Sequence, residues 1–179
     1  MKNFPIEHEG KTYWISRAVA VVGLIFTYKN DRLFVLANKR GKGTPDFQGY
    51  WNCPCGYLDF DETIPQACCR EIDEETNLKV FPKDLFLYGI NDDPKDEHQN
   101  ITFRYWSYST RYAYEPIYAK GEEQDEVEEV RWIPVDELNC YDFAFNQKSI
   151  IIGVVGDYLS SLVSTETLLK LRKSDVQSH

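Results

Sequence analysis

The sequence predicts a single α/β domain, from its composition and from the order of its hydrophobic patterns. The chain has 179 residues, of which 42% are hydrophobic and 15% aromatic, and this is enough to bury one sizeable core. Strand-like patterns precede and follow one amphipathic helical segment, and apolar helical patterns close the chain. No internal repeat or linker divides it. We therefore expect one domain over residues 1–179, with a core at about 18–160, a short N-terminal extension and a C-terminal tail.

The first strong strand signal is the apolar run at residues 18–26, which predicts a buried strand. A second apolar run follows at residues 32–37, and the polar segment 29–31 between them has the composition of a turn. Together they predict a β-hairpin. The next segment, residues 39–45, combines basic residues with glycine and proline, so we expect an exposed loop there.

A short strand at residues 50–51 and a loop at 54–62 are predicted to lead into an acidic helix. Thr63 and Gln66 have the spacing of a capping box, in which each residue satisfies a backbone N–H of the first helical turn. Pro65 is tolerated only within that first turn, where its missing N–H would have no helical partner. Two independent signals thus place the helix start near Thr63.

Later segments complete the predicted fold. Alternating aromatic and β-branched residues predict three further strands, and spaced apolar residues near the end of the chain suit one or two closing helices. The strands are expected at residues 85–90, 101–114 and 129–133, and the helices within residues 148–171.

Net charge and hydrophobicity exclude several classes of function. The formal charge of −9 at pH 7 argues against binding along a nucleic-acid backbone or an anionic membrane, although a metal could still offset the acid for a small anionic substrate. No stretch reaches the roughly 18 apolar residues of a membrane helix, and the first residues lack the hydrophobic core of a signal peptide. We therefore expect a soluble, cytoplasmic protein that does not enter a membrane.

The five cysteines are an odd number, which suits reduced thiols in the cytoplasm better than a disulfide framework. Cys53 and Cys55 form a CxC pair and Cys68 and Cys69 are adjacent, so none has the C-x2-C spacing of structural zinc sites. The three histidines lie far apart in the sequence. A histidine-built metal site and a Ser-His-Asp triad are therefore poorly supported.

The predicted helix carries its glutamates toward its buried side. At about 100° per residue, Glu71 and Glu75 fall among the apolar residues and Glu74 falls at their border. These three side chains converge within about 5–6 Å, and their repulsion requires shifted protonation, a basic partner or a bound cation. Oxygen ligands without histidine favour Mg²⁺ or Mn²⁺. The alternative is an acidic surface helix, which would carry its acids opposite the core, as Asp73 is placed.

Residues 56–78 resemble the Nudix box, the signature of the Nudix hydrolase family. Gly56, Glu62 and the run Arg70-Glu71-Ile72-Asp73-Glu74-Glu75-Thr76-Asn77-Leu78 match the pattern GX5EX7REUXEEXGU at every defined position but one. The exception is Asn77, where the family usually has glycine; asparagine also takes the left-handed conformation that ends a helix. A second departure is Cys55, where the family commonly has glycine before the loop.

The resemblance continues outside this box. Lys39-Arg40 is similar to the family's basic pair after the second strand, residues 51–54 to its Trp-x-x-Pro lead-in, and residues 130–138 to its late strand and turn. Together they cover about residues 19–159. The resemblance implies an α/β/α sandwich around a mixed β-sheet.

The resemblance also implies a metal site that holds Mg²⁺ or Mn²⁺. Glu71, Glu74 and Glu75 are the expected metal ligands, and the carbonyl of Gly56 would approach a metal as the loop wraps around it. Glu71 or a separate loop acid would orient or deprotonate the attacking water.

The resemblance implies further members of the catalytic set. Arg70 would hold a glutamate in place, and Glu62 would support the metal shell. Glu126 is the preferred candidate for an extra catalytic glutamate within the acidic run at residues 122–129, although such a run is more often a solvated loop. Lys39 and Arg40 are candidate contacts for substrate phosphates, or else part of a solubilising loop.

The function that the resemblance implies is hydrolysis of a phosphoanhydride bond by a metal-activated water. The expected partner is a small nucleoside diphosphate linked to another group, with ADP-ribose-like or nucleotide-sugar substrates ahead of triphosphates. Pro94, sixteen positions after Leu78, suggests the ADP-ribose branch, although turns attract proline regardless. The aromatic strand at residues 103–114 could stack a base or simply pack in the sheet.

Two other functions and one assembly state stay open at this point. A catalytically silent Nudix-fold module that senses nucleotides or acts as a scaffold would account for Asn77 and Cys55. An isoprenoid diphosphate isomerase would need a cysteine and a glutamate over the carbon skeleton of its substrate. A homodimer is compatible with the sequence.

Overall fold

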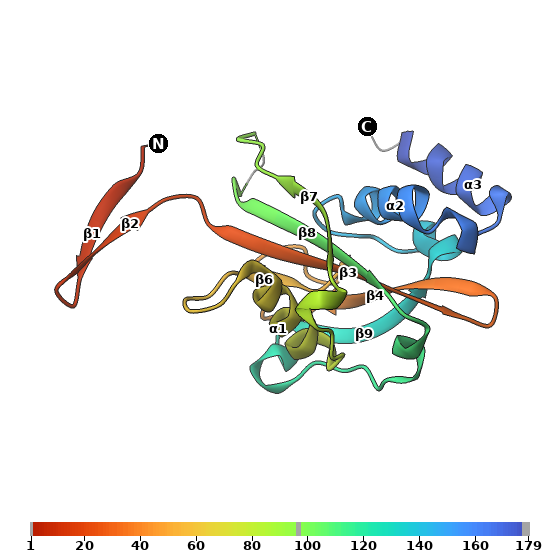
Figure 1. The fold of residues 1–179 in the computed structure, drawn as a ribbon, viewed down its shortest axis with the longest axis horizontal. Coiled ribbons are helices and arrows are strands. Elements are labelled where there is room, and N and C mark those ends of the chain that lie inside the picture. The colour runs from red at the N-terminus through yellow and green to blue at the C-terminus, as the bar shows by residue number, and fades with distance from the viewer. Residues whose placement is uncertain (1, 96–97, 177–179) are drawn as a thin grey trace.

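A mixed β-sheet separates helix α1 from helices α2 and α3 in the computed structural model, which describes residues 2–95 and 98–176 (Figure 1). The strand order is β5-β4-β3-β8-β7, with β6 paired to β3 and β9 paired to β4. β3 and β8 are parallel, and the other pairs in this sheet are antiparallel. The strands are β3 (Val19–Lys29), β4 (Arg32–Arg40), β5 (Trp51–Asn52), β6 (Cys55–Tyr57), β7 (Phe86–Asn91), β8 (Ile101–Tyr108) and β9 (Val127–Pro134).

The sequence predicted one or two closing helices, and the structure has two. The α-helices are α1 (Ile64–Thr76), α2 (Gln147–Tyr158) and α3 (Thr165–Val176). Short 3-10 helices connect the other elements: η1 (Pro82–Asp84), η2 (Thr110–Tyr114), η3 (Gly121–Gln124), η4 (Val135–Cys140) and η5 (Ser160–Leu162). Leu171 of α3 is only 2% exposed, so the segment expected as a C-terminal tail packs on the body at least to this residue. No helix among the described residues is long and apolar enough to cross a membrane.

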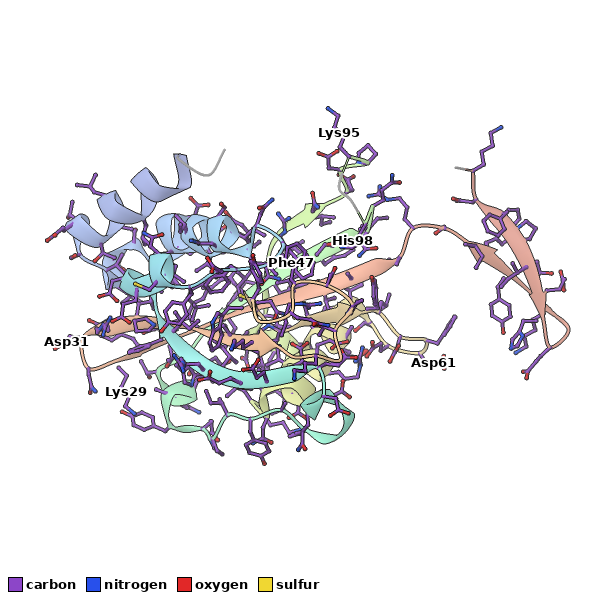
Figure 2. All side chains as sticks on the ribbon, turned by 180° about the vertical axis from the view of Figure 1, so that it is seen from behind. Lys29, Asp31, Phe47, Asp61, Lys95 and His98 are labelled. Atoms are coloured by element: carbon purple, nitrogen blue, oxygen red, sulfur yellow. The ribbon has the colours of Figure 1, made fainter. Side chains whose placement is uncertain are left out.

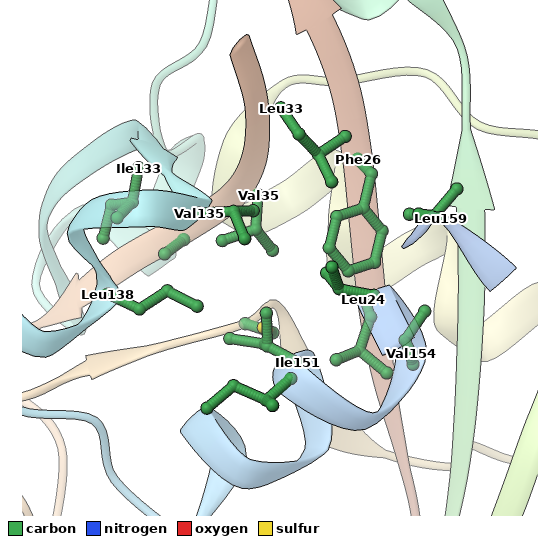
Figure 3. Close-up of a cluster of buried hydrophobic side chains, with 14 of the residues drawn as sticks. Leu24, Phe26, Leu33, Val35, Ile133, Val135, Leu138, Ile151, Val154 and Leu159 are labelled. Atoms are coloured by element: carbon green, nitrogen blue, oxygen red, sulfur yellow. The ribbon is translucent and has the colours of Figure 1, made fainter. Parts of the chain in front are cut away.

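Strand β3 is buried on both faces, which explains its continuous apolar run. Because side chains alternate along a strand, Val21 and Ile25 pack in the cluster under α1, while Leu24 and Phe26 pack in the cluster under α2. Figure 3 shows the second cluster, where Ile151 of α2 lies against the side chains of the sheet. Two hydrophobic cores therefore fix the helices on opposite faces of one sheet.

Gly23 brings helix α1 close to the sheet. A Cβ atom added there would lie 2.7 Å from Ile72 Cδ1 and 3.3 Å from Cys68 Sγ, both on α1. A larger residue would have to push the helix away from β3. The absence of a side chain at Gly23 thus sets the depth at which α1 presents its glutamates.

The N-terminal extension forms a hairpin that the sequence did not predict. Strands β1 (Phe4–His8) and β2 (Lys11–Ile15) form a separate two-stranded sheet that extends away from the body (Figure 1). Glu9 and Gly10 join them with φ angles of 49° and 74°, the positive values of a tight hairpin turn. The strands mix polar and apolar residues without strict alternation, so their pattern gave no strand signal.

Three other predictions needed correction. Residues 39–45 are not simply an exposed loop, because β4 continues to Arg40, and Gly41 and Thr44 are buried. The strand expected at residues 101–114 ends at Tyr108, because Ser109 starts a 3-10 turn in which its hydroxyl accepts the N–H of Arg111 at 3.3 Å. Thr27 Oγ1 also donates to the Ser109 carbonyl at 2.8 Å and anchors this turn to β3. The loop expected at residues 54–62 contains strand β6, in which Gly56 pairs with Val21 of β3.

Both ends of helix α1 lie where the sequence places them. The backbone N–H of Thr63 donates to Gln66 Oε1 at 2.8 Å, as a capping box requires. Asn77 has the left-handed φ of 59°, and its N–H donates to the Asp73 carbonyl at 2.7 Å. Asparagine therefore fills the glycine position at the end of the helix.

We expect Asn77→Ala to lower the free energy of unfolding by about 1–2 kcal/mol, because alanine pays the steric penalty of the left-handed region without the local hydrogen bonds of asparagine. Asn77→Gly should stay within about 1 kcal/mol of the wild type, since glycine relieves strain but loses the 3.3 Å bond from Asn77 Nδ2 to the Pro116 carbonyl. Urea unfolding of both variants measures the difference. Equal losses in the two variants would show that the left-handed backbone is not the cause.

Candidate active site

Two buried glutamates of α1 face strand β6. Glu71 is 9% exposed and Glu75 is 7% exposed, as their predicted placement among the apolar residues requires. The backbone N–H of Cys55 donates to Glu75 Oε2 at 3.0 Å. A Cβ atom on Gly56 would lie 2.2 Å from Glu71 Oε1, so the glycine leaves the space that this carboxylate occupies. Strand β6 and helix α1 thus meet through the carboxylates of Glu71 and Glu75.

Arg70 is a basic partner within this acidic group. Its Nη1 donates to Glu71 Oε1 at 2.8 Å and to Glu74 Oε2 at 3.0 Å. On the other side, its Nε and Nη2 bind the two oxygens of Glu62 at 3.1 and 2.8 Å, and Nη2 also reaches the Tyr57 carbonyl at 3.0 Å. One guanidinium therefore ties three carboxylates to the loop and offsets their mutual repulsion.

The hydrogen bonds within this network stabilise the charged forms of its members. The bonds from Arg70 hold the pKa of Glu62 below its usual range, against the smaller opposing effect of burial. The bond to Glu62 raises the pKa of Arg70, with further contributions from Glu71 and Glu74. Glu62 and Arg70 are consequently ionised at neutral pH and form a fixed support beneath Glu71.

A cleft of about 740 Å³ opens beside the buried glutamates. Its lining brings together residues that the sequence analysis took from distant segments: Gly56, Glu71, Glu75, Arg40 and Glu126. Arg70, Glu62 and Glu74 do not line it; the side chain of Glu74 is 41% exposed and turned to Arg70. The predicted residues thus divide into a cleft-lining set and a supporting set.

Glu126 is held at the cleft by its backbone. The N–H of Gly41 donates to the Glu126 carbonyl at 2.6 Å, and the N–H of Gly43 donates to the Asp125 carbonyl at 2.9 Å. A Cβ atom on Gly41 would lie 2.6 Å from the Asp125 carbonyl oxygen, so the two segments approach closely only because a glycine is present. The middle of the acidic run is therefore a bound segment beside the cleft.

The two residues of the basic pair point to different places. Lys39 Nζ binds Glu128 Oε1 at 2.8 Å and does not line the cleft. Arg40 lines the cleft and binds Asp46 Oδ1 at 2.6 Å. Lys39 and Arg40 are consecutive residues of β4, so their side chains point to opposite faces of the sheet.

Several cleft residues were not predicted from the sequence. Strand β8 contributes Thr102 and Arg104, while His98 precedes this strand and Phe145 precedes α2. The only sign of them in the sequence was that polar Thr102 and Arg104 alternate with aromatic residues along the predicted strand. The aromatic rings of that strand, from Phe103 to Tyr108, pack in the two cores instead of offering a stacking surface.

Cys55 also lines the cleft, and its sulfur accepts a hydrogen bond from Asn52 Nδ2 at 3.2 Å. Burial and the neighbouring Glu75 raise the pKa of the Cys55 thiol to about 12, so the thiol is protonated at neutral pH. All five cysteines are free, as the sequence predicted.

The donor atoms of the cleft residues are carboxylate oxygens, which suit a hard divalent cation. Glu71 and Glu75 supply carboxylate oxygens at the cleft, and the absence of a side chain at Gly56 lets the Glu71 carboxylate lie against the backbone of β6. Over the described part of the chain, however, no three acidic, cysteine or histidine side chains are already grouped as a metal site. Arg70 instead binds Glu71 and Glu74 in this arrangement.

The sheet between helices and the glutamate-lined cleft define an α/β/α protein with an oxygen-donor site beside β3, β6 and β8. Residues 16–152 match the model of the NUDIX domain. The chain therefore belongs to the Nudix family, and the family expected from the sequence is confirmed.

Known relatives agree with this assignment. The chain is 33% identical over 81 residues to the ADP-ribose pyrophosphatase of Methanocaldococcus jannaschii, an alignment that covers 45% of this chain and 43% of that protein. The match therefore spans less than half the length of this relative.

Solved structures share the fold. The NUDIX domain of Shewanella oneidensis NrtR, complexed with ADP ribose, superposes with a TM-score of 0.65 at 22% identity, over 76% of this chain and 85% of that one. The bifunctional NMN adenylyltransferase/ADP ribose pyrophosphatase of Francisella tularensis, complexed with AMP and a Mn ion, superposes with a TM-score of 0.60 at 23% identity. The superposition covers 79% of this chain and 42% of that one. The predicted α/β/α fold is confirmed.

Proposed function

We propose that this chain is a Mg²⁺- or Mn²⁺-dependent pyrophosphohydrolase that acts on a nucleoside diphosphate linked to another group. The observation that carries the proposal is the pair of buried carboxylates, Glu71 and Glu75, at the wall of a cleft beside Gly56. Buried acids cost stability unless a partner compensates them, and a core has no need of them. A binding site for a cation and a phosphate-bearing ligand accounts for their retention.

Glu71, Glu74 and Glu75, with the carbonyl of Gly56, would hold the metal. When bound, the ion would neutralise charge on the bridging phosphate oxygens and acidify a water molecule for attack. Glu71 or Glu126, which both line the cleft, would orient that water or accept its proton.

Arg70 and Glu62 act in this proposal as positioning residues. Arg70 fixes the direction of the Glu71 carboxylate through the 2.8 Å bond, and the bidentate contact with Glu62 fixes Arg70 in turn. Arg40 is the candidate contact for a substrate phosphate because its guanidinium lines the cleft. Lys39, which binds Glu128, is the weaker candidate.

The proposed substrates are ADP-ribose-like compounds or nucleotide sugars ahead of triphosphates. The names of the relatives support this choice, since one is an ADP-ribose pyrophosphatase and one was solved with ADP ribose. Pro94 lies in the loop between β7 and β8, at the position that suggested the ADP-ribose branch. Five free cysteines favour a reducing, cytoplasmic location, and a homodimer stays a prediction.

A substrate panel with product analysis tests the proposal. Purified protein is incubated with ADP-ribose, nucleotide sugars and triphosphates in Mg²⁺ or Mn²⁺, and the products are separated by chromatography. We expect ADP-ribose and water to give AMP and ribose 5-phosphate, and we expect a chelator to stop the reaction. A folded protein that releases no product from any compound would contradict hydrolysis. Calorimetric binding without turnover would then support a sensing module, and a product of unchanged mass from an isoprenoid diphosphate would support an isomerase.

A further inference from the structure

An aromatic cluster stands at one side of the cleft, built from three segments that are far apart in the sequence. Phe47 follows β4, His98 precedes β8, and Phe145 precedes α2. The rings of Phe47 and Phe145 are 4.8 Å apart at 67°, and those of His98 and Phe145 are 6.1 Å apart, also at 67°. Figure 2 shows Phe47 and His98 close together on the face of the molecule where these segments meet. Phe145 and His98 both line the cleft.

Both phenylalanines are held in an unfavourable backbone conformation. Phe47 has a φ of 47° and Phe145 a φ of 55°, in the left-handed region that bulky residues rarely adopt. Gln99 and Asn146, the neighbours of His98 and Phe145, also have positive φ angles, of 52° and 55°. Such conformations cost free energy and cluster at ligand-binding positions, where the surrounding structure fixes a side chain in a required direction.

The cluster is not simply part of the hydrophobic core. Phe47 is 39% exposed, and the neighbouring Tyr50, whose ring is 5.6 Å from that of Phe47, is 42% exposed. The edge-to-face angles leave ring surfaces uncovered by one another. If the strained backbone served only to pack these rings, we would expect the rings to be buried.

Charged residues connect the cluster to the acidic part of the cleft. The carboxylate of Asp46 binds Arg40 through Oδ1 at 2.6 Å and His98 through Oδ2 at 3.2 Å. The guanidinium of Arg40 also lies over the Phe145 ring, 5.0 Å from its centroid. The cleft thus contains the half-buried ring of Phe145, the exposed ring of His98, an arginine and two buried glutamates, and Phe47 packs against Phe145 beside it. A nucleotide has the same sequence of groups, a flat aromatic base followed by charged phosphates.

We propose that Phe47, Phe145 and His98 form a subsite that stacks on the nucleobase of the substrate and so selects nucleoside diphosphates over diphosphates without a base. This inference rests on the proposed function and adds to it the residues that recognise the base. Arg40 joins the two parts, since it contacts the aromatic subsite and would face the phosphates. Stacking on ring faces is tolerant of base identity, so selection is for an aromatic group and not for one particular base.

The test compares two substrates in matched variants. Phe145→Leu and Phe47→Leu keep an apolar side chain but remove the aromatic face. Steady-state hydrolysis is measured with ADP-ribose and with the corresponding compound in which a ribose without adenine replaces the adenosine. We expect each variant to raise KM for ADP-ribose about tenfold with kcat changed less than threefold, and to leave KM for the compound without a base within twofold. Phe145→Tyr should keep KM for ADP-ribose near the wild-type value, because tyrosine keeps the aromatic ring that leucine removes.

Phe81→Leu is the control, because Phe81 is 60% exposed and lies outside the cleft. Thermal unfolding of each variant checks that it is folded. Equal rises of KM for both substrates, or no rise in either variant, would overturn the subsite.

If the wild type hydrolyses nothing, calorimetry with AMP and ribose 5-phosphate still decides the subsite separately from the proposed function. Binding of AMP at least tenfold tighter than ribose 5-phosphate, lost in Phe145→Leu, supports the subsite. Equal affinities, or an AMP affinity that the variant retains, overturn it.

Discussion

Replacing Glu75 with glutamine is expected to lower kcat by about 10² to 10³-fold while the protein stays folded. Glutamine has nearly the same size, and its side-chain oxygen can still accept the N–H of Cys55 that Glu75 Oε2 accepts at 3.0 Å. The substitution therefore removes the negative charge and little else. Loss of charge at a 7% exposed position that lines the cleft weakens cation binding directly. Steady-state hydrolysis of ADP-ribose measures the change, and urea unfolding measures stability.

Asp73→Asn is the matched control on the same helix. Asp73 does not line the cleft, and it binds Lys79 and Lys120 on the other face of α1. Burial opposes its charge, but the two lysines outweigh this effect and lower the pKa of Asp73. We expect this variant to lose some stability and to keep kcat within twofold. Wild-type activity in Glu75→Gln, or an equal loss in Asp73→Asn, would refute the role assigned to Glu75.

Local geometry explains why the acidic helix was predictable. The start at Thr63, the end at Asn77 and the buried placement of Glu71 and Glu75 all follow from spacing along one helix. Only the helical repeat and the chemistry of the capping residues are needed for such predictions. The β3–β4 hairpin was predictable for the same reason, since its two strands are adjacent in the sequence.

Long-range geometry explains what the sequence did not reveal. Lys39 and Arg40 are equivalent as basic residues on opposite faces of β4, and only the placement of elements distant in the sequence decides that the face of Arg40 borders the cleft. The aromatic cluster joins Phe47, His98 and Phe145 through loops separated by about fifty residues, and periodicity contains no information on such contacts. The alternating aromatic residues of β8 were the visible candidates for base stacking in the sequence, but their rings pack in the cores.

Gly56→Ala is expected to reduce both activity and stability. The added Cβ would lie 2.2 Å from Glu71 Oε1 and 2.3 Å from its Cδ, so the carboxylate must move. The backbone of β6 cannot easily yield, because Gly56 pairs with Val21 in the sheet. Moving Glu71 also breaks its 2.8 Å bond to Arg70. Overpacking of this kind costs about 1–3 kcal/mol of unfolding free energy, and a displacement of about 1 Å at a reacting group lowers kcat about 10²-fold.

Two further variants separate the causes of this loss. Gly89→Ala is the control within a strand, since no atom lies within 4 Å of a Cβ added at Gly89, and it should change stability by less than about 0.5 kcal/mol. In a Glu71→Ala background the clash at Gly56 is absent, so Gly56→Ala should there cost less than about 1 kcal/mol. Activity should not return, because the carboxylate is missing. If Gly56→Ala costs the same stability with and without Glu71, the carboxylate is not what excludes a side chain from position 56, and the close contact between loop and helix would lose its assigned role.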